Sequence, residues 1–349
     1  MKLALSTMML LACCTAVRGE DPESIALSEQ LVLEKIGVMF VGGKESAMPA
    51  GGRRGGGGTQ TQISGQSLVH YLIPANNSGQ KKLPVIMVPG MGLTSYLYLS
   101  TPDGREGWAS LFARAGHPVY VLDGPQNVVT GIDVAPFANV QSGRAEANAL
   151  PRMMLWANEI TWDRWGIGTE PGKPLANSRF PVKQIDQLHA SMTPVIGGGM
   201  GGGRRGGASS QPSAEADAIA MLLDQVGPAI LVVHSMAGSS GFAATRLRPD
   251  KVKAIIAVEV VGSPTDTDDI KKYFADKQLI GVYGDNFEMR RMQGRYEATV
   301  EMAKQISDSG GTAEVIRLPD LGIEGNSHLL MQDNNNDDIA KMILRRLNP

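Results

Sequence analysis

A serine at the end of an apolar run is the side chain of this protein best placed to do chemistry. The apolar residues 229–233 are followed directly by His234 and Ser235, and then by small residues. A β-branched run that ends in this way is typical of a buried strand that turns sharply into a helix. Such a turn holds a hydroxyl clear of the sheet, so Ser235 is a candidate nucleophile for acyl transfer. Helix capping or packing explains a serine at this place equally well, and the rest of the chain has to distinguish the two.

A serine nucleophile needs a base, which a histidine further along the chain can supply. The chain has five histidines, and only His328 lies well beyond the serine, in the segment Gly325-Asn326-Ser327-His328 after the last apolar run. A loop at that place is free to reach the serine, so we expect His328 to be the general base. His234 precedes the serine on the same predicted strand and is expected to point away from it.

Two carboxylates compete for the role of orienting that histidine. Glu259 ends the apolar run 255–258, where an unpaired charge would be costly to bury. Asp285 follows the apolar run 279–283 in a Gly-Asp-Asn turn, where it could equally well stabilise the turn. We favour Glu259, because its apolar surroundings demand a partner and His328 is available. Asp285 is kept as the alternative acid.

The oxyanion of an acyl-transfer reaction needs backbone N–H donors beside the nucleophile. Met236 directly follows the serine, and Met91 lies in a turn after the apolar run 84–88. Gly90 and Gly92 flank Met91 and allow that backbone to turn inward. We therefore expect the amides of Met91 and Met236 to form the oxyanion hole.

These residues need a scaffold that brings the ends of several strands together. The apolar runs predict eight strands, over residues 35–40, 67–73, 84–88, 119–122, 229–234, 254–259, 279–283 and 313–318. Helices are predicted over residues 107–115, 214–226, 290–309 and 337–347. The first two strands resemble an antiparallel hairpin, and the later ones are apolar throughout, as strands covered on both faces are. The sequence therefore predicts an α/β fold with a mostly parallel eight-stranded sheet and helices on both faces.

Two tracts rich in glycine and arginine interrupt this pattern, at residues 51–58 and 197–207. Their composition is unsuited to packing, so they are predicted to be loops. No clear strand is predicted between residues 123 and 211, and we interpret residues 124–213 as a cap inserted over the site. The tryptophans and methionines of this segment favour an uncharged and fairly hydrophobic substrate.

The first residues are typical of an export signal. Lys2 supplies a positive charge, and the apolar stretch that follows is too short to span a bilayer. We predict a signal peptide over residues 1–19, a mature domain over residues 20–349, and an exported protein that is periplasmic or secreted. A lipoprotein signal with Cys13 as the lipidated residue is an alternative. Cys13 and Cys14 both lie in this segment, so no disulfide is expected in the mature domain.

Composition and motifs indicate no macromolecular partner and no cofactor. The formal net charge is −2, which predicts no attraction to nucleic acid or to an anionic membrane. No other apolar stretch is long enough to span a membrane. Residues 333–337 resemble a calcium loop but lack its glycine and its later glutamate, so we interpret them as a helix cap before Ile339. Neither glycine tract continues as a phosphate-binding loop. No metal site is predicted.

Six motifs are spread along the chain. They are Pro89-Gly90-Met91-Gly92, Thr101-Pro102-Asp103-Gly104-Arg105-Glu106-Gly107-Trp108, Val119-Tyr120-Val121-Leu122-Asp123, His234-Ser235, Val258-Glu259 and Gly325-Asn326-Ser327-His328. Together they resemble the α/β-hydrolases and, more narrowly, a group of bacterial exported esterases that cleave esters of halogenated cyclic compounds. The resemblance implies the α/β-hydrolase fold, a serine hydrolase whose acid follows the sixth strand, at Glu259, an inserted cap and a homodimer.

The sequence thus predicts a carboxylic ester hydrolase that acts on a small-molecule ester through an acyl-enzyme intermediate, with Ser235, His328 and Glu259 as its triad. A lipase or a polyester hydrolase is the alternative within enzymes. A non-catalytic envelope protein with the same fold is a second alternative, because Val233 and Ala237 stand where the common elbow Gly-x-Ser-x-Gly has glycine.

Overall fold

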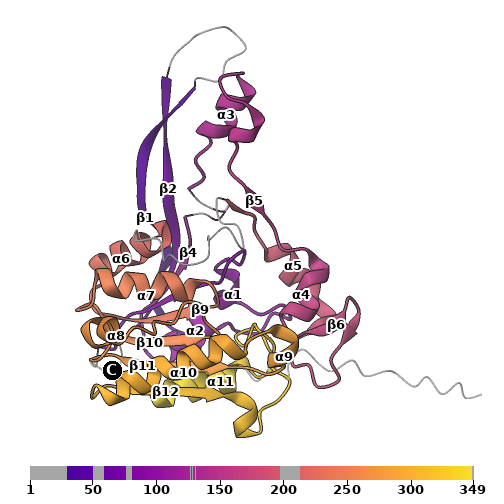
Figure 1. Cartoon of the computed structure of the whole chain (residues 1–349), viewed down its shortest axis with the longest axis vertical. Coiled ribbons are helices and arrows are strands. Elements are labelled where there is room, and N and C mark those ends of the chain that lie inside the picture. Colours follow the sequence, from indigo (N-terminus) through magenta and orange to yellow (C-terminus); the bar gives the residue numbers. More distant parts are fainter. Residues whose placement is uncertain are drawn as a thin grey trace, which may run out of the picture.

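A single large sheet forms the centre of the protein (Figure 1). The computed structural model describes residues 30–49, 59–75, 81–125, 127, 129, 131–196 and 213–347. The sheet has eight strands in the order β1-β2-β4-β3-β9-β10-β11-β12. The strands from β4 to β12 are parallel, and β2 is antiparallel to β1 and to β4. The strands are β1 (Leu33–Pro49), β2 (Thr59–Pro74), β3 (Val85–Val88), β4 (Val119–Asp123), β9 (Ala229–His234), β10 (Val252–Val258), β11 (Gln278–Tyr283) and β12 (Thr312–Arg317).

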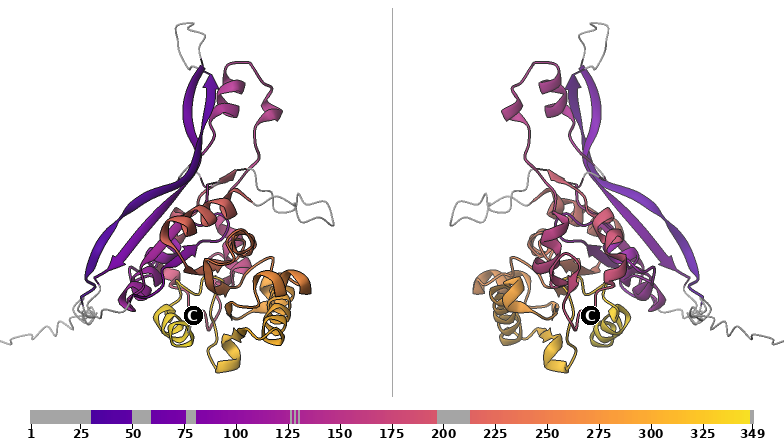
Figure 2. Two further views of the ribbon diagram at one scale, coloured as in Figure 1. Left: turned by 90° about the vertical axis from the view of Figure 1, so that its left-hand side faces the viewer. Right: turned by 90° about the vertical axis from the view of Figure 1, so that its right-hand side faces the viewer.

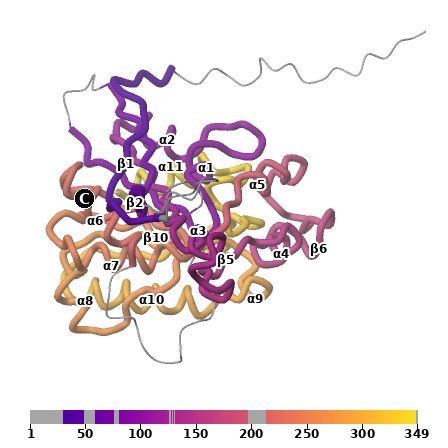
Figure 3. The backbone as a smooth tube through the Cα atoms, turned by 90° about the horizontal axis from the view of Figure 1, so that it is seen from above, coloured from indigo at the N-terminus to yellow at the C-terminus, as the bar shows by residue number. Residues whose placement is uncertain are grey.

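Helices cover both faces of the parallel part, as Figure 3 shows from above. The helices on one face are α2 (Trp108–Arg114) and α11 (Asn336–Arg346), and those on the other are α6 (Ala214–Val226), α7 (Ala237–Leu247), α8 (Thr267–Tyr273) and α10 (Gln293–Asp308). Successive residues of β9 alternate between the two layers of core. Ile230 belongs to the same buried cluster as Trp108 of α2, and Leu231 to the same cluster as Phe242 of α7. This two-sided burial is the reason that the central strands are apolar throughout.

The first two strands form a long hairpin that extends beyond the sheet as an arm (Figures 1 and 2). Their register runs without a break from Lys35, opposite Ile73, to Val41, opposite Ser67. The predicted antiparallel hairpin is therefore confirmed, although both strands are longer than the sequence predicted. The helix α3 (Ala135–Gln141) lies beside this arm.

The segment between β4 and α6 contains only short elements. They are α3, η2 (Ala147–Ala149), β5 (Met153–Met154), α4 (Asn158–Arg164), β6 (Gly168–Glu170), β7 (Lys173–Pro174), η3 (Val182–Gln184), α5 (Ile185–Ser191) and β8 (Val195–Ile196). Four of these are strands, which corrects the prediction that the segment has none. They left no pattern in the sequence because each is two or three residues long and pairs with another short strand, so no apolar run marks it.

All eight strands predicted from the apolar runs are present. The helices predicted over 107–115, 214–226 and 337–347 are also confirmed within one residue at each end. The helix predicted over 290–309 is confirmed as α10 but begins only at Gln293, since Arg291 has a φ of +54° that no helix continues through; the short helix α9 (Phe287–Arg290) precedes it. The remaining elements are α1 (Tyr96–Leu99) and η4 (Leu318–Leu321).

Several sequence predictions fall on residues outside the described ranges. These are the signal peptide at 1–19 with Cys13 and Cys14, and the glycine-rich tracts at 51–58 and 197–207. Among the residues that are described, no helix combines the length and the apolar character needed to cross a membrane.

Candidate active site

Ser235 lies in a tight turn between β9 and α7. Its φ is +52°, in the left-handed region that a residue other than glycine rarely adopts. Its backbone is fixed on both sides, because its N–H donates to the Val258 carbonyl at 3.0 Å and its carbonyl accepts from the Val261 N–H at 2.8 Å. Both partners belong to or follow the neighbouring strand β10. The strained turn is therefore held by the sheet itself, and it places the serine at the carboxyl end of the parallel strands.

The sequence raised the question of how Val233 fits where the common elbow has glycine. In the structure the missing space is provided from the helix side, by Gly241. A Cβ on Gly241 would lie 2.6 Å from Cγ1 of Val233, so only glycine at 241 lets α7 pass over the strand. Gly90 has a similar role on the other side, since a Cβ there would lie 2.9 Å from Cβ of Ser235. The departure from the usual motif thus leaves the geometry of the turn intact.

We expect Gly241→Ala to destabilise the protein by about 1–3 kcal/mol, because the added methyl group overpacks the contact with Val233. The double variant Val233→Ala with Gly241→Ala makes room for the same methyl group. Its loss of unfolding free energy is expected to be smaller than the sum of the losses of the two single variants. Urea unfolding of the four proteins measures this coupling, and simple additivity would contradict the packing argument.

His328 and Glu259 are in direct contact. His328 Nδ1 is hydrogen-bonded to Oε2 of Glu259, although the two residues lie far apart in the sequence. Glu259 directly follows β10, is fully buried and has a φ of +46°. The N–H of Gly284 donates to its Oε1 at 2.8 Å, and the guanidinium of Arg290 forms an ion pair with its Oε2. The buried carboxylate is therefore paired, as its apolar surroundings require.

These contacts set the charge state of the pair. Burial alone would raise the pKa of Glu259, but the charge of Arg290 and the hydrogen bond with His328 hold that pKa well below its ordinary value. Burial lowers the pKa of His328, and the Glu259 carboxylate only partly opposes this shift. Near neutral pH the carboxylate is thus ionised and the imidazole is neutral. Because an ionised carboxylate can only accept, Nδ1 carries the proton and Nε2 is left as the acceptor.

The alternative acid, Asp285, is not in contact with His328. Its Oδ1 accepts from the Asn286 N–H at 2.6 Å and its Oδ2 from the Gly325 N–H at 3.0 Å. Both oxygens accept from backbone N–H groups. Oδ1 stabilises the turn that contains Asp285, and Oδ2 stabilises the loop that leads to His328. The structure therefore gives Asp285 the turn-stabilising role that the sequence left open for it.

Asp333 holds the His328 loop from the other side. Its carboxylate accepts from the hydroxyl of Ser327 at 2.7 Å, from the Ser327 N–H at 2.8 Å and from the side-chain amide of Asn326 at 2.8 Å. Burial raises the pKa of Asp333 to about 6, against these hydrogen bonds. Residues 333–337 do lead into α11, with Asn335 at its N-cap, but the side chain of Asn335 makes no capping bond and is instead bonded to Asn326.

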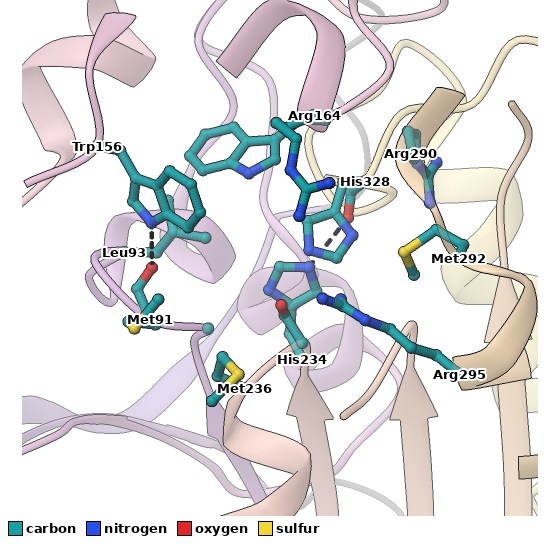
Figure 4. A pocket seen from close by; sticks show the side chains of 13 residues that line it. Met91, Leu93, Trp156, Arg164, His234, Met236, Arg290, Met292, Arg295 and His328 are labelled. Carbon is teal, nitrogen blue, oxygen red and sulfur yellow. Dashed lines mark hydrogen bonds between the residues drawn. The ribbon is translucent and has the colours of Figure 1, made fainter. Parts of the chain in front are cut away.

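Ser235, His328 and His234 line one pocket, which has an empty volume of about 520 Å³ including the part open to solvent (Figure 4). The prediction that His234 points away from the nucleophile is wrong. Its Nε2 donates to the backbone carbonyl of His328 at 3.0 Å, and the two rings lie 4.5 Å apart. The alternation of a strand does not apply here, since β9 ends at His234 and the chain turns at Ser235. In the described residues no hydrogen bond joins Ser235 to either histidine.

Met91 and Met236 lie on the same side of the pocket (Figure 4). The backbone N–H groups of both residues are without a hydrogen-bond partner in the described parts of the chain. The turn that contains Met91 is held from the inserted segment, because the indole N–H of Trp156 donates to the Met91 carbonyl at 2.9 Å. Trp156 also packs edge-on against Trp165, with ring centroids 5.8 Å apart. Residues of the segment between β4 and α6 therefore form one wall of the pocket.

Sequence reasoning missed the arginines of this pocket, which are Arg164, Arg290 and Arg295. An arginine in a helical segment is most often on a solvated face, so the sequence carried no signal that these three converge. The sequence indicated that a buried Glu259 needs a partner for its charge, but we expected only His328 in that role. Within the described residues, no group of three or more His, Cys, Asp or Glu side chains is arranged to hold a metal ion.

Comparison with known proteins gives two informative matches, and no family model matches the chain. A solved structure of a novel bacterial esterase superposes with a TM-score of 0.81 at 27% sequence identity, over 91% of this chain and 96% of that one. The probable secreted lipase phiG of Fungal sp. (strain ATCC 74256) is 32% identical over 208 residues, which are 57% of this chain. The matched region spans 50% of the length of that lipase.

Proposed function

We propose that this protein, which has the α/β-hydrolase fold predicted from its sequence, is a carboxylic ester hydrolase with Ser235 as its nucleophile. The observation that carries the proposal is that two residues with a strained backbone lie at the carboxyl edge of the sheet, each directly after a parallel strand. Ser235 occupies a turn with positive φ and opens onto the pocket that His328 lines, and Glu259, with positive φ, is bonded to that histidine. The similarity to a bacterial esterase and to a secreted lipase supports the same reaction.

In the proposed reaction the hydroxyl of Ser235 attacks the ester carbonyl and its proton passes to Nε2 of His328. Glu259 keeps the proton on Nδ1 and stabilises the imidazolium that forms. The imidazolium then protonates the departing alcohol, which leaves an acyl-serine. A water molecule, activated by the same histidine, attacks the acyl-serine and releases the acid.

The negative charge that develops on the carbonyl oxygen needs donors that are already in place. The unpaired N–H groups of Met91 and Met236 are available for this purpose. Met91 follows β3 and Met236 follows Ser235, so both donors belong to turns fixed by the sheet. In this proposal the bond from Trp156 keeps the first turn in position.

The finer predictions from the sequence remain proposals. The segment of residues 124–213 would act as the cap, since Trp156 and Trp165 form a wall of the pocket. Membership in the exported esterase group that cleaves esters of halogenated cyclic compounds and a homodimer rest on sequence resemblance. Export rests on the predicted signal peptide at residues 1–19. The word "secreted" in the name of the lipase fits an exported protein.

Labelling with a fluorophosphonate probe tests the nucleophile without knowledge of the substrate. We expect covalent modification of one residue, Ser235, when the labelled protein is digested and mapped by mass spectrometry. Labelling should be lost in His328→Ala, because the hydroxyl then has no base. A folded protein that takes up no label at Ser235 would contradict the proposal and favour the non-catalytic alternative.

The acid side of the pH profile follows from the charge state of His328. Catalysis requires the neutral imidazole, and burial lowers the pKa of His328 from its ordinary value of 6.5. Protonation therefore removes activity only below that pH, so the acid limb of kcat/KM for a neutral ester should have its midpoint below 6.5. Glu259→Gln removes the charge that raises this pKa, and the midpoint of its residual activity should move further down. A wild-type midpoint above 6.5 would contradict the assignment.

A further inference from the structure

The pocket beside Ser235 has a strong excess of positive charge. Arg164 ends α4, Arg290 ends α9 and Arg295 lies in the first turn of α10, and all three line the pocket. The other lining residues are apolar side chains, one glycine, Ser235 and the two histidines. No carboxylate is among these lining residues of the described chain. Figure 4 shows the side chains of Arg164 and Arg295 extending from opposite walls toward the two histidines.

Two of these arginines, Arg164 and Arg295, have no ion-paired or hydrogen-bonded partner for their guanidinium groups among the described residues. Elsewhere in the protein partly exposed arginines are paired, as Arg246 is with Asp269 and Arg105 with Asp103. Exposed arginines such as Arg291 and Arg345 also form no ion pair within the described chain, but Arg164 and Arg295 are only partly exposed and line the same pocket.

Arg290 forms an ion pair with Glu259 but still has unused hydrogen-bond donors. Its side chain is fully buried, and its Nε and Nη1 atoms have no hydrogen-bond partner. Arg295 is partly buried, and this burial lowers the pKa of its guanidinium. A guanidinium stays protonated even so, and its donors lie in a fork that matches a carboxylate. An anion that entered the pocket would meet partly dehydrated donors at little further cost.

We propose that the natural substrate is an ester that carries an ionised carboxylate in addition to its ester bond, and that Arg164 and Arg295 bind this carboxylate. The inference rests on the proposed function, since it concerns the substrate of the same site. It replaces the sequence-based expectation of an uncharged substrate, which took account of the tryptophans and methionines of the inserted segment and not of its arginine. The tryptophans form an apolar wall, against which the hydrocarbon part of the substrate between its ester group and its carboxylate packs.

A different role for the arginines would be to tune the catalytic histidine. The charges of Arg290 and Arg295 both lower the pKa of His328. An effect of that kind changes the cleavage of charged and neutral esters alike, whereas recognition of a carboxylate changes only their ratio. The ratio of kcat/KM for matched esters therefore separates the two roles.

The test uses two matched pairs of chromogenic esters, because the carboxylate could lie on the acyl side or on the alcohol side. The first pair is 4-nitrophenyl hydrogen glutarate and its methyl ester. The second pair is the acetate of 3-hydroxy-4-nitrobenzoic acid and the methyl ester of that acetate. The anionic-to-neutral ratio of kcat/KM is measured for the wild type and for Arg164→Met, Arg295→Met and Arg295→Lys. The control is Arg345→Met, which removes an exposed arginine of α11 that does not line the pocket.

For at least one pair we expect the ratio to fall roughly tenfold or more in Arg164→Met and in Arg295→Met, the size of one lost charge-assisted hydrogen bond. The anionic-to-neutral ratio should fall less in Arg295→Lys than in Arg295→Met, and it should be unchanged in Arg345→Met. Added salt should lower the ratio of the wild type. Ratios that stay within about threefold of the wild type in both methionine variants and for both pairs overturn the inference. Cleavage of the neutral esters alone also overturns it and leaves the proposed function standing. A folded protein that cleaves no ester and takes up no fluorophosphonate overturns both.

Discussion

Replacing Ser235 with alanine is expected to lower kcat for ester hydrolysis by roughly 10⁴-fold or more, with the fold unchanged. The reason is that alanine leaves the strained turn and the oxyanion donors in place but removes the only atom that forms the acyl intermediate. His328→Ala should cost a similar factor, and the double variant little more than either single one, because the two residues act in the same step. Steady-state kinetics with a neutral 4-nitrophenyl ester measures all three.

The matched control for this prediction is Ser239→Ala. Ser239 lies in the first turn of α7 and donates to the Val261 carbonyl at 3.1 Å, but it does not line the pocket. Its removal should change kcat by no more than about twofold. Equal losses in the two serine variants, or losses that multiply in Ser235→Ala with His328→Ala, would contradict the shared nucleophilic step.

Replacing Glu259 with glutamine is expected to lower kcat by about 10³- to 10⁴-fold, whereas Asp285→Asn should lower it by less than about tenfold. The first change removes the charge that stabilises the imidazolium and fixes its tautomer. The second weakens one of two backbone contacts and leaves His328 with its partner. Kinetics of the two purified variants under one set of conditions gives the ranking, and the reverse order would rule out Glu259 as the acid.

Glu259→Gln also leaves Arg290 buried opposite a neutral side chain, so folding has to be measured alongside activity. The double variant Glu259→Gln with Arg290→Met removes the stranded charge. We expect it to regain thermal stability relative to Glu259→Gln without regaining activity. Recovery of both would mean that Glu259 acts only through the stability of the fold.

Local sequence patterns determined the secondary structure of this protein to a large extent. The eight apolar runs each became a strand of the central sheet, and those at the centre of its parallel part are buried on both faces by the helices that cover them. The turn at Ser235 was also visible, since a strand that ends at a small polar residue and continues as a helix has a specific local pattern. The short strands between β4 and α6 left no such pattern.

The sequence also favoured Glu259 over Asp285 as the acid, because its apolar surroundings demand a partner, and in the structure Glu259 is bonded to His328. The contact itself was not predictable from local patterns, because it joins residues 69 positions apart. The same is true of Gly241, whose importance comes from its place over Val233 and not from its neighbours in the chain. Each of these facts depends on which strand lies beside which.

The tertiary structure alone decided the electrostatics of the pocket. Arg164 comes from the inserted segment, while Arg290 and Arg295 follow β11, on either side of the break at Arg291. A local pattern reports whether a residue fits a helix or a strand, since those preferences depend on near neighbours. Coulomb interactions and burial depend instead on distance in space, so the convergence of three arginines on one serine became visible only once the chain was folded.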